Sequence, residues 1–129
     1  MARVVLDSSV LIALISPNDI HHDAAIRATS AKHQYLISAV TLSESLVIPF
    51  RTSAKTAERI RTTIEKAVAA VVPINADIAT LGAQARAISN LKMPDALISA
   101  TATYEKSELW TFDKTLASTH KGARLIAHS

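Results

Sequence analysis

Two aspartates of the chain each follow a short apolar segment. Asp7 comes directly after the apolar segment 4–6, and Asp113 follows segment 109–112 in the same relation. Asp at such a position can cap the helix that comes next, so each residue alone is open to a structural and to a functional interpretation. Ligands of open α/β sheets bind outside the carboxyl ends of the strands. Because two separate segments would bring an aspartate to that edge, we expect the pair to have a chemical function.

Two further carboxylates are predicted to lie in helices. Asp95 follows Pro94 just inside a predicted helix, where its charge would also interact favourably with the helix dipole. Glu44 is in a helix interior with Val40 four residues before it and Ile48 four residues after it, so we expect its carboxylate to project from the apolar face. A carboxylate turned toward a core needs a basic partner or a metal ion. No basic residue flanks Glu44 locally, which leaves a distant basic partner or a metal.

Four carboxylates at one site would repel one another, and a divalent cation would relieve the repulsion. The chain has no cysteine, so a metal site must use oxygen or histidine ligands. Carboxylate oxygens favour hard ions such as Mg²⁺ or Mn²⁺, with a phosphate substrate as the usual companion. Such an ion lowers the pKa of bound water and neutralises charge on the leaving oxygen. The sequence therefore predicts metal-dependent chemistry on a phosphate ester, with these metal ligands and catalytic residues: Asp7, Glu44, Asp95 and Asp113.

The segments around these residues predict a single α/β domain over residues 1–129. Short apolar runs predict strands at 2–6, 35–38, 71–74 and 109–112, with a fifth at 124–127. Longer segments with one apolar face predict helices at 9–15, 20–31, 39–50, 54–70, 75–90 and 94–105. We expect Pro49 to end or kink the third helix, and the strand at 71–74 to include Pro73. The alternation favours a short, mainly parallel sheet of about four or five strands with helices on both faces.

Composition excludes several classes of protein. Of the 129 residues, 49% are hydrophobic and 19% are charged, which rules out a disordered chain. The first apolar run is interrupted by Asp7, Ser8 and Ser9, unlike a secretion signal, and no apolar stretch reaches the roughly 18 residues of a membrane span. Only two glycines are present, too few for the Gly-rich loops that bind nucleotides. We therefore expect a cytoplasmic protein with no membrane contact and no nucleotide cofactor.

The formal net charge of +3 is compatible with a nucleic-acid partner. Segment 51–66 carries five basic and two acidic residues, so much of the positive charge is concentrated there. A solvated helix face is one interpretation of this segment. The other is contact with RNA phosphates or with an acidic stretch of a protein partner. The candidates for such contacts are Arg51, Lys55 and Arg59.

Four segments of the chain resemble the signature regions of PIN domains, particularly the VapC-type toxin ribonucleases of bacteria and archaea. They are VVLDSSVLIAL, ISAVTLSESLV, MPDALISATA and LWTFDKTL, and they extend collinearly from Val4 to Leu116. The resemblance implies a Mg²⁺- or Mn²⁺-dependent endoribonuclease, the toxin of a type II toxin–antitoxin pair, which binds a cognate antitoxin and forms a homodimer. Its acidic quartet falls on the four carboxylates above, and Ser9 matches the small polar residue that supports the first aspartate.

Two other functions remain open on the residues alone. A Mg²⁺-dependent phosphotransferase or phosphatase would use Asp7 as a nucleophile, but Ser9 stands where the second aspartate of such enzymes is usual. A non-catalytic binding module, in which the carboxylates only cap helices, would have no metal affinity. His21 and His22 are adjacent, so on a helix their side chains diverge and do not share an ion.

Overall fold

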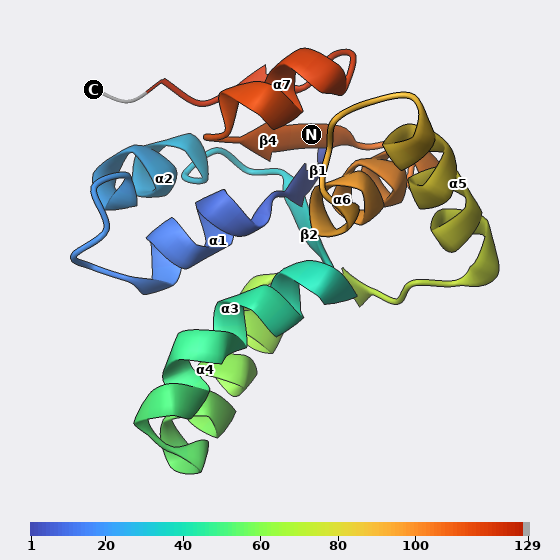
Figure 1. Cartoon of the computed structure of the whole chain (residues 1–129). Helices are drawn as coiled ribbons and strands as arrows, with labels where there is room; N and C mark the ends of the chain where they lie inside the picture. Colours follow the sequence, from blue (N-terminus) through green and yellow to red (C-terminus); the bar gives the residue numbers. More distant parts are fainter. Residues whose placement is uncertain (128–129) are drawn as a thin grey trace.

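The centre of the molecule is a five-stranded sheet in which all paired strands are parallel. A computed structural model describes residues 1–127 of the chain (Figure 1). The strand order is β3-β2-β1-β4-β5, and neighbouring strands pair in parallel throughout. The strands are β1 (Arg3–Leu6), β2 (Gln34–Ser38), β3 (Ala70–Val72), β4 (Glu108–Thr111) and β5 (Arg124–Leu125). The predicted α/β class with a mainly parallel sheet is confirmed.

Seven helices connect and follow these strands in the described residues. They are α1 (Ser8–Ile15), α2 (His22–Ala28), α3 (Ala39–Thr52), α4 (Ala54–Ala67), α5 (Ala76–Ala87), α6 (Met93–Tyr104) and α7 (Lys114–Thr119). Helices α3 and α4 pack side by side and project away from the sheet (Figure 1). Within the described part of the chain, no helix is both long and apolar enough to cross a membrane.

The sheet has a hydrophobic core on each face. Val4 and Leu6 of β1 belong to one core cluster, together with apolar residues of α1, α2 and α4. Val5, between them, belongs to a second cluster on the opposite face, with residues of α5, α6 and α7. Alternate residues of a strand point to opposite faces, so a sheet covered on both faces requires an uninterrupted apolar strand. This requirement explains the apolar run 4–6.

Several predicted boundaries are wrong, for local reasons. Pro49 does not end α3, because its carbonyl still accepts a helical hydrogen bond from Ser53 N, and the helix continues to Thr52. Strand β3 ends at Val72, so Pro73 lies outside it. Helix α4 ends at Ala67 because the chain then becomes extended and pairs beside β2.

Three other elements are shorter than expected. Helix α2 covers only His22–Ala28, because the chain before it forms a turn at Asp19. The Oδ1 atom of Asp19 accepts a hydrogen bond from His21 N, and its carbonyl accepts one from His22 N. Helix α5 ends at Ala87, three residues before the expected end. The fifth strand is reduced to Arg124–Leu125. None of these changes moves a predicted carboxylate to another element.

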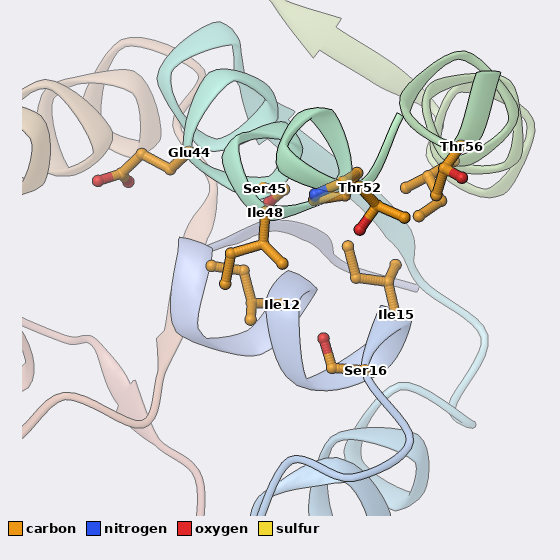
Figure 2. Close-up of a pocket in the computed structure, with 10 residues that line it drawn as sticks. Ile12, Ile15, Ser16, Glu44, Ser45, Ile48, Thr52 and Thr56 are labelled. Carbon is orange, nitrogen blue, oxygen red and sulfur yellow. The ribbon is translucent and has the colours of Figure 1, made fainter. Parts of the chain in front are cut away.

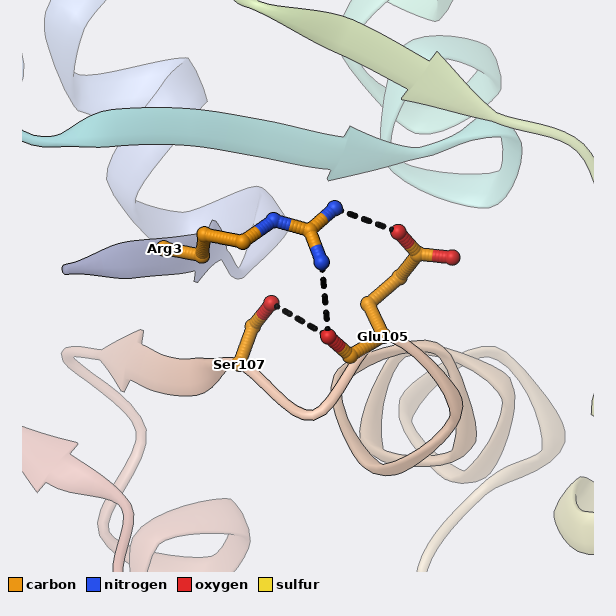
Figure 3. A network of polar contacts seen from close by, with 3 residues as sticks. All are labelled: Arg3, Glu105 and Ser107. Carbon is orange, nitrogen blue, oxygen red and sulfur yellow. Dashed lines mark hydrogen bonds and ion pairs between the residues drawn. The ribbon is translucent and has the colours of Figure 1, made fainter.

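The two edges of the sheet differ in their polar contacts. At the edge where β1 begins, the guanidinium of Arg3 forms an ion pair with Glu105 at 2.7 Å and also donates to the Glu105 carbonyl at 2.9 Å, which accepts from Ser107 as well (Figure 3). This network joins β1 to the end of α6. At the opposite edge, α1, α3 and α7 begin directly after β1, β2 and β4. The carboxyl-terminal edge is therefore the one that carries the predicted functional residues.

Candidate active site

Asp7 lies at the end of β1 and is nearly inaccessible, with 3% of its surface exposed. Its Oδ2 accepts hydrogen bonds from Ser9 Oγ at 2.7 Å and from Thr111 Oγ1 at 2.8 Å, with a longer contact to Ser9 N at 3.4 Å. Its Oδ1 is buried and has no hydrogen-bond partner among residues 1–127. Buried polar atoms in folded proteins are almost always paired. A carboxylate oxygen left without a donor is consistent with a position for a cation.

The hydroxyls beside Asp7 also fix the neighbouring strand end. Ser9 Oγ accepts from Phe112 N at 3.1 Å, and Thr111 Oγ1 accepts from Asp113 N at 2.9 Å. The two side chains therefore hold Asp7 and the backbone leading to Asp113 in one network. Ser9 occupies the supporting position that the resemblance implied. Sequence analysis missed Thr111, although a polar residue within the apolar segment 109–112 was a signal for it.

Glu44 is placed differently from the expectation. It is exposed on α3, and its neighbours Val47 and Ile48 are 46% and 70% exposed, so this face of the helix does not pack on the core. The predicted burial is wrong because α3 buries a different face, the one that carries Thr41, Ser45 and Pro49. Ser8 Oγ donates to Glu44 Oε1 at 2.5 Å and lies 3.2 Å from Thr41 Oγ1. Ser8, which sequence analysis did not select, thus holds Glu44 beside the start of α1.

Asp95 shows that the four carboxylates are electrostatically connected. It lies partly buried in the first turn of α6. Its pKa is raised from 3.8 to about 6, chiefly by burial and then by the negative charges of Asp7, Asp113 and Glu44, while the charge of Lys92 lowers it. Charges act on one another in this way only when they are close or poorly screened. The carboxylates of four separate segments therefore lie around one region.

Asp113 both caps a helix and lines a groove. Its Oδ1 accepts from Thr115 N at 2.8 Å and from Leu116 N at 3.2 Å, so it is the N-cap of α7. A groove of about 210 Å³ lies beside it and beside Asp95. The other residues that line this groove are Asn90, Leu91, Lys92 and Thr115. Asp113 thus faces a space large enough for part of a ligand.

A second groove, of about 230 Å³, lies between α1, α3 and α4 and is mainly apolar. Ile12, Ile15 and Ile48 form much of its wall, whereas the carboxylate of Glu44 points away from them (Figure 2). Glu44 therefore stands at the border between the apolar groove and the acidic residues.

The basic residues of segment 51–66 lie away from the carboxylates. Arg51 is about two helical turns beyond Glu44 on α3, and Lys55 and Arg59 are on α4 in the projecting helix pair (Figure 1). All three side chains are exposed. The structure does not bring them to the acidic residues.

The donor set suits a hard divalent cation in its chemistry. All of its ligands would be oxygens, one of them is the unpaired Oδ1 of Asp7, and the mutual repulsion at Asp95 is what such an ion relieves. In the positions described for residues 1–127, no three carboxylate or imidazole groups lie close enough to enclose an ion. The outer side chains, such as Glu44, would have to turn inward to bind one.

Ligands of parallel α/β domains bind outside the carboxyl ends of the strands, where this chain has several acidic side chains. The fold and the site therefore define an α/β protein with an acidic ligand-binding edge. The sequence model of the PIN domain matches residues 4–122, so the chain belongs to the PIN-domain family. The resemblance seen in the four sequence segments is confirmed.

Several solved structures have the same fold as this chain. A chain of a toxin–antitoxin complex from Klebsiella pneumoniae is 27% identical to this one. The alignment covers 93% of this chain and 94% of the other chain, with a TM-score of 0.78. FitAcB from Neisseria gonorrhoeae is 19% identical, and its alignment covers 94% of this chain and 95% of the other chain, with a TM-score of 0.78. VapC20 of Mycobacterium tuberculosis, described as a sarcin-ricin loop cleaving toxin, is 19% identical, with coverage of 95% and 98% and a TM-score of 0.78. Proteins with curated descriptions give no significant match.

Proposed function

We propose that this protein is a metal-dependent endoribonuclease and the toxin of a type II toxin–antitoxin pair. The observation that carries the proposal is the convergence of carboxylates at the carboxyl-terminal edge of the sheet: Ser9 and Thr111 join Asp7 to the strand end that leads to Asp113, and Asp113 and Asp95 line one groove. Membership of the PIN-domain family and the likeness to a toxin–antitoxin complex support it. The reaction is hydrolysis of an RNA phosphodiester with water as the nucleophile.

Four carboxylates would hold Mg²⁺ or Mn²⁺ in this proposal: Asp7, Glu44, Asp95 and Asp113. When bound, the ion would lower the pKa of a water molecule and neutralise charge on the leaving oxygen. Ser9 and Thr111 fix Asp7 through its Oδ2, which leaves Oδ1 as the ligand atom. Ser8 orients Glu44 through Oε1. Such supporting hydrogen bonds set the direction of a ligand before the ion arrives.

The two rival functions have less support. A phosphotransferase would use Asp7 as its nucleophile, but Ser9 stands where the second aspartate of such enzymes is usual, and its hydroxyl donates to Asp7 Oδ2 at 2.7 Å. A binding module in which aspartates only cap helices accounts for the contacts of Asp113 with α7. It accounts neither for the buried, unpaired Oδ1 of Asp7 nor for the shifted pKa of Asp95.

Protein partners are supported by the surface of α3. Ile48 lines the apolar groove and is 70% exposed, and Val47 and Phe50 of the same helix are 46% and 60% exposed. Apolar side chains clustered at a groove usually mark an interface. We propose that a cognate antitoxin and a second copy of the chain are the partners that cover this region. An Ile48→Asp variant should then lose antitoxin binding or dimerisation in size-exclusion chromatography while keeping its far-UV circular dichroism spectrum.

The decisive experiment measures RNA cleavage and metal affinity together. Wild-type protein should cleave RNA in Mn²⁺ or Mg²⁺ and not in EDTA, and calorimetry should detect Mn²⁺ binding that Asp95→Asn weakens. Asp23→Asn is a matched control, because Asp23 is also an aspartate in the first turn of a helix but is exposed on α2. Cleavage that persists in EDTA, or equal Mn²⁺ binding by the three proteins, would contradict the proposal.

A further inference from the structure

The groove beside Asp95 and Asp113 extends the acidic region toward residues with different chemistry. Asn90, Lys92 and Thr115 line its other parts and offer an amide, an ammonium and a hydroxyl group. Asn90 and Lys92 belong to the connection between α5 and α6, and Thr115 belongs to the first turn of α7. None of these three was selected by the sequence analysis, and the hydrolytic step proposed above does not use them.

A polyanionic substrate meets an electrostatic problem at this edge of the sheet. Four carboxylates repel the phosphates of RNA, and a bound divalent ion compensates only the phosphate at which cleavage occurs. The neighbouring phosphates need their own positive charges. Lys92 is the one cation among the residues that line the groove, and its charge lowers the pKa of Asp95, against the larger effects that raise it. The ammonium is therefore close to the place where the substrate would lie.

Lys92 is also free to bind an anion. It is exposed, and it is the residue before the first turn of α6 without making a side-chain hydrogen bond to that helix. In the described residues, ion pairs within 4.0 Å join only Arg3 to Glu105 and Arg61 to Glu65. A lysine that has no carboxylate partner at contact distance, and that stands over a groove next to an acidic site, has its charge available for a ligand.

We propose that Lys92 binds the RNA phosphate adjacent to the one that is cleaved, with Asn90 and Thr115 lining the same groove around the sugar–phosphate backbone. This inference rests on the proposed ribonuclease function and names a substrate-binding subsite for it. The basic residues of α4 do not fill this role, because they lie on the projecting helix pair away from the carboxylates (Figure 1). A lysine that contacts a phosphate contributes affinity and no base preference.

The test uses RNA binding, so that it does not depend on cleavage. Glu44→Gln serves as the background, because Glu44 does not line this groove and its loss should prevent cleavage. Fluorescence anisotropy with short oligo(U) and oligo(A) RNA is measured in Mn²⁺ at pH 8.5. This pH lies well above the pKa of Asp95, which is about 6 in the wild-type protein.

Adding Lys92→Gln should weaken the binding of both RNAs by about five- to tenfold and should flatten the slope of log Kd against log salt by about 0.7, the value for one phosphate contact on a single strand. Lys92→Arg should restore most of the affinity because it keeps the charge. Lys32→Gln is the control, since Lys32 precedes β2 and so lies toward the opposite edge of the sheet, and it should leave both quantities unchanged.

Several results would overturn the subsite. They are unchanged affinity or salt slope in the Lys92→Gln protein, an equal effect of Lys32→Gln, a loss confined to one of the two RNAs, and no measurable RNA binding in the Glu44→Gln background. Failure of the ribonuclease proposal looks different: wild-type protein would not cleave RNA in Mn²⁺, although the Lys92-dependent binding could still be present.

Discussion

Neutralising Asp95 should stabilise the metal-free protein while it abolishes activity. The pKa of Asp95 is raised from 3.8 to about 6, chiefly by burial and then by three other carboxylates. A shift of this size corresponds to about 3 kcal/mol, and solvent screening of a partly exposed group reduces it to about 1–2 kcal/mol. For a domain of 129 residues this amounts to a rise in melting temperature of roughly 4–8 °C.

The sign of the effect fixes its pH dependence. The folded protein holds a proton on Asp95 more tightly than the unfolded chain, so the ionised carboxylate destabilises the folded state. This cost is fully present above the folded pKa of about 6 and disappears below the unfolded value of 3.8. Melting curves of wild type and Asp95→Asn in EDTA should therefore differ at pH 8 and converge at pH 3.5 if both remain folded there.

A second aspartate in the same helical position provides the control. Asp23 lies in the first turn of α2, as Asp95 does in α6, but it is exposed and outside the acidic region. Asp23→Asn removes a favourable interaction with the helix dipole and should lower stability by about 0.3–1 kcal/mol. Addition of Mn²⁺ should raise the melting temperature of wild type and Asp23→Asn more than that of Asp95→Asn, through linkage of binding to folding. If Asp95→Asn melts below wild type in EDTA at pH 8, the electrostatic reasoning is wrong.

Other expected outcomes concern activity. Amide substitution of each carboxylate should lower kcat/KM for Mn²⁺-dependent RNA cleavage by at least about 100-fold, and double variants should lose little more, because the residues act as a unit; the substitutions are Asp7→Asn, Glu44→Gln, Asp95→Asn and Asp113→Asn. Ser8→Ala and Thr111→Val should each weaken Mn²⁺ binding by about 10–100-fold in calorimetry, since each removes a hydrogen bond that orients a ligand. Mass spectrometry of the fragments should find 5′-phosphate and 3′-hydroxyl ends, and a cyclic phosphate would exclude water as the nucleophile. Asp113→Ser keeps a good N-cap for α7 and should retain the melting temperature, yet cleavage should be lost; full activity in this variant would remove Asp113 from the metal ligands.

The sequence predicted the sheet because local patterns decide it. A parallel strand covered on both faces must be apolar at consecutive positions, and segment 4–6 meets that condition. Asp7 and Asp113 were found from the same patterns, since each directly follows an apolar strand segment, whereas α7, the helix that Asp113 caps, was not predicted. These features depend on neighbouring residues only.

The environment of Glu44 depends on packing between distant segments and could not be predicted locally. An apolar stripe on a helix shows which face is apolar but does not show which face packs on the rest of the molecule. Helix α3 buries the face of Thr41, Ser45 and Pro49, whereas Val47 and Ile48 are exposed. The choice of Ser8 as the partner of Glu44 likewise depends on how α1 and α3 meet. The groove at Lys92 exists only where the connection between α5 and α6 meets the starts of α6 and α7.

Helix capping and metal binding are compatible roles for the same aspartates. The contacts of Asp7 with hydroxyls and a backbone N–H use Oδ2, and the cap that Asp113 makes uses Oδ1. A carboxylate has two oxygens, so a cap or supporting bond at one of them fixes the direction of the other. In a parallel sheet the N-termini of the following helices lie at the edge where the strands end. An aspartate that caps such a helix is thereby held at the ligand-binding edge with one oxygen left to coordinate. The structural interpretation of these residues thus supplies the rigidity that the functional interpretation requires.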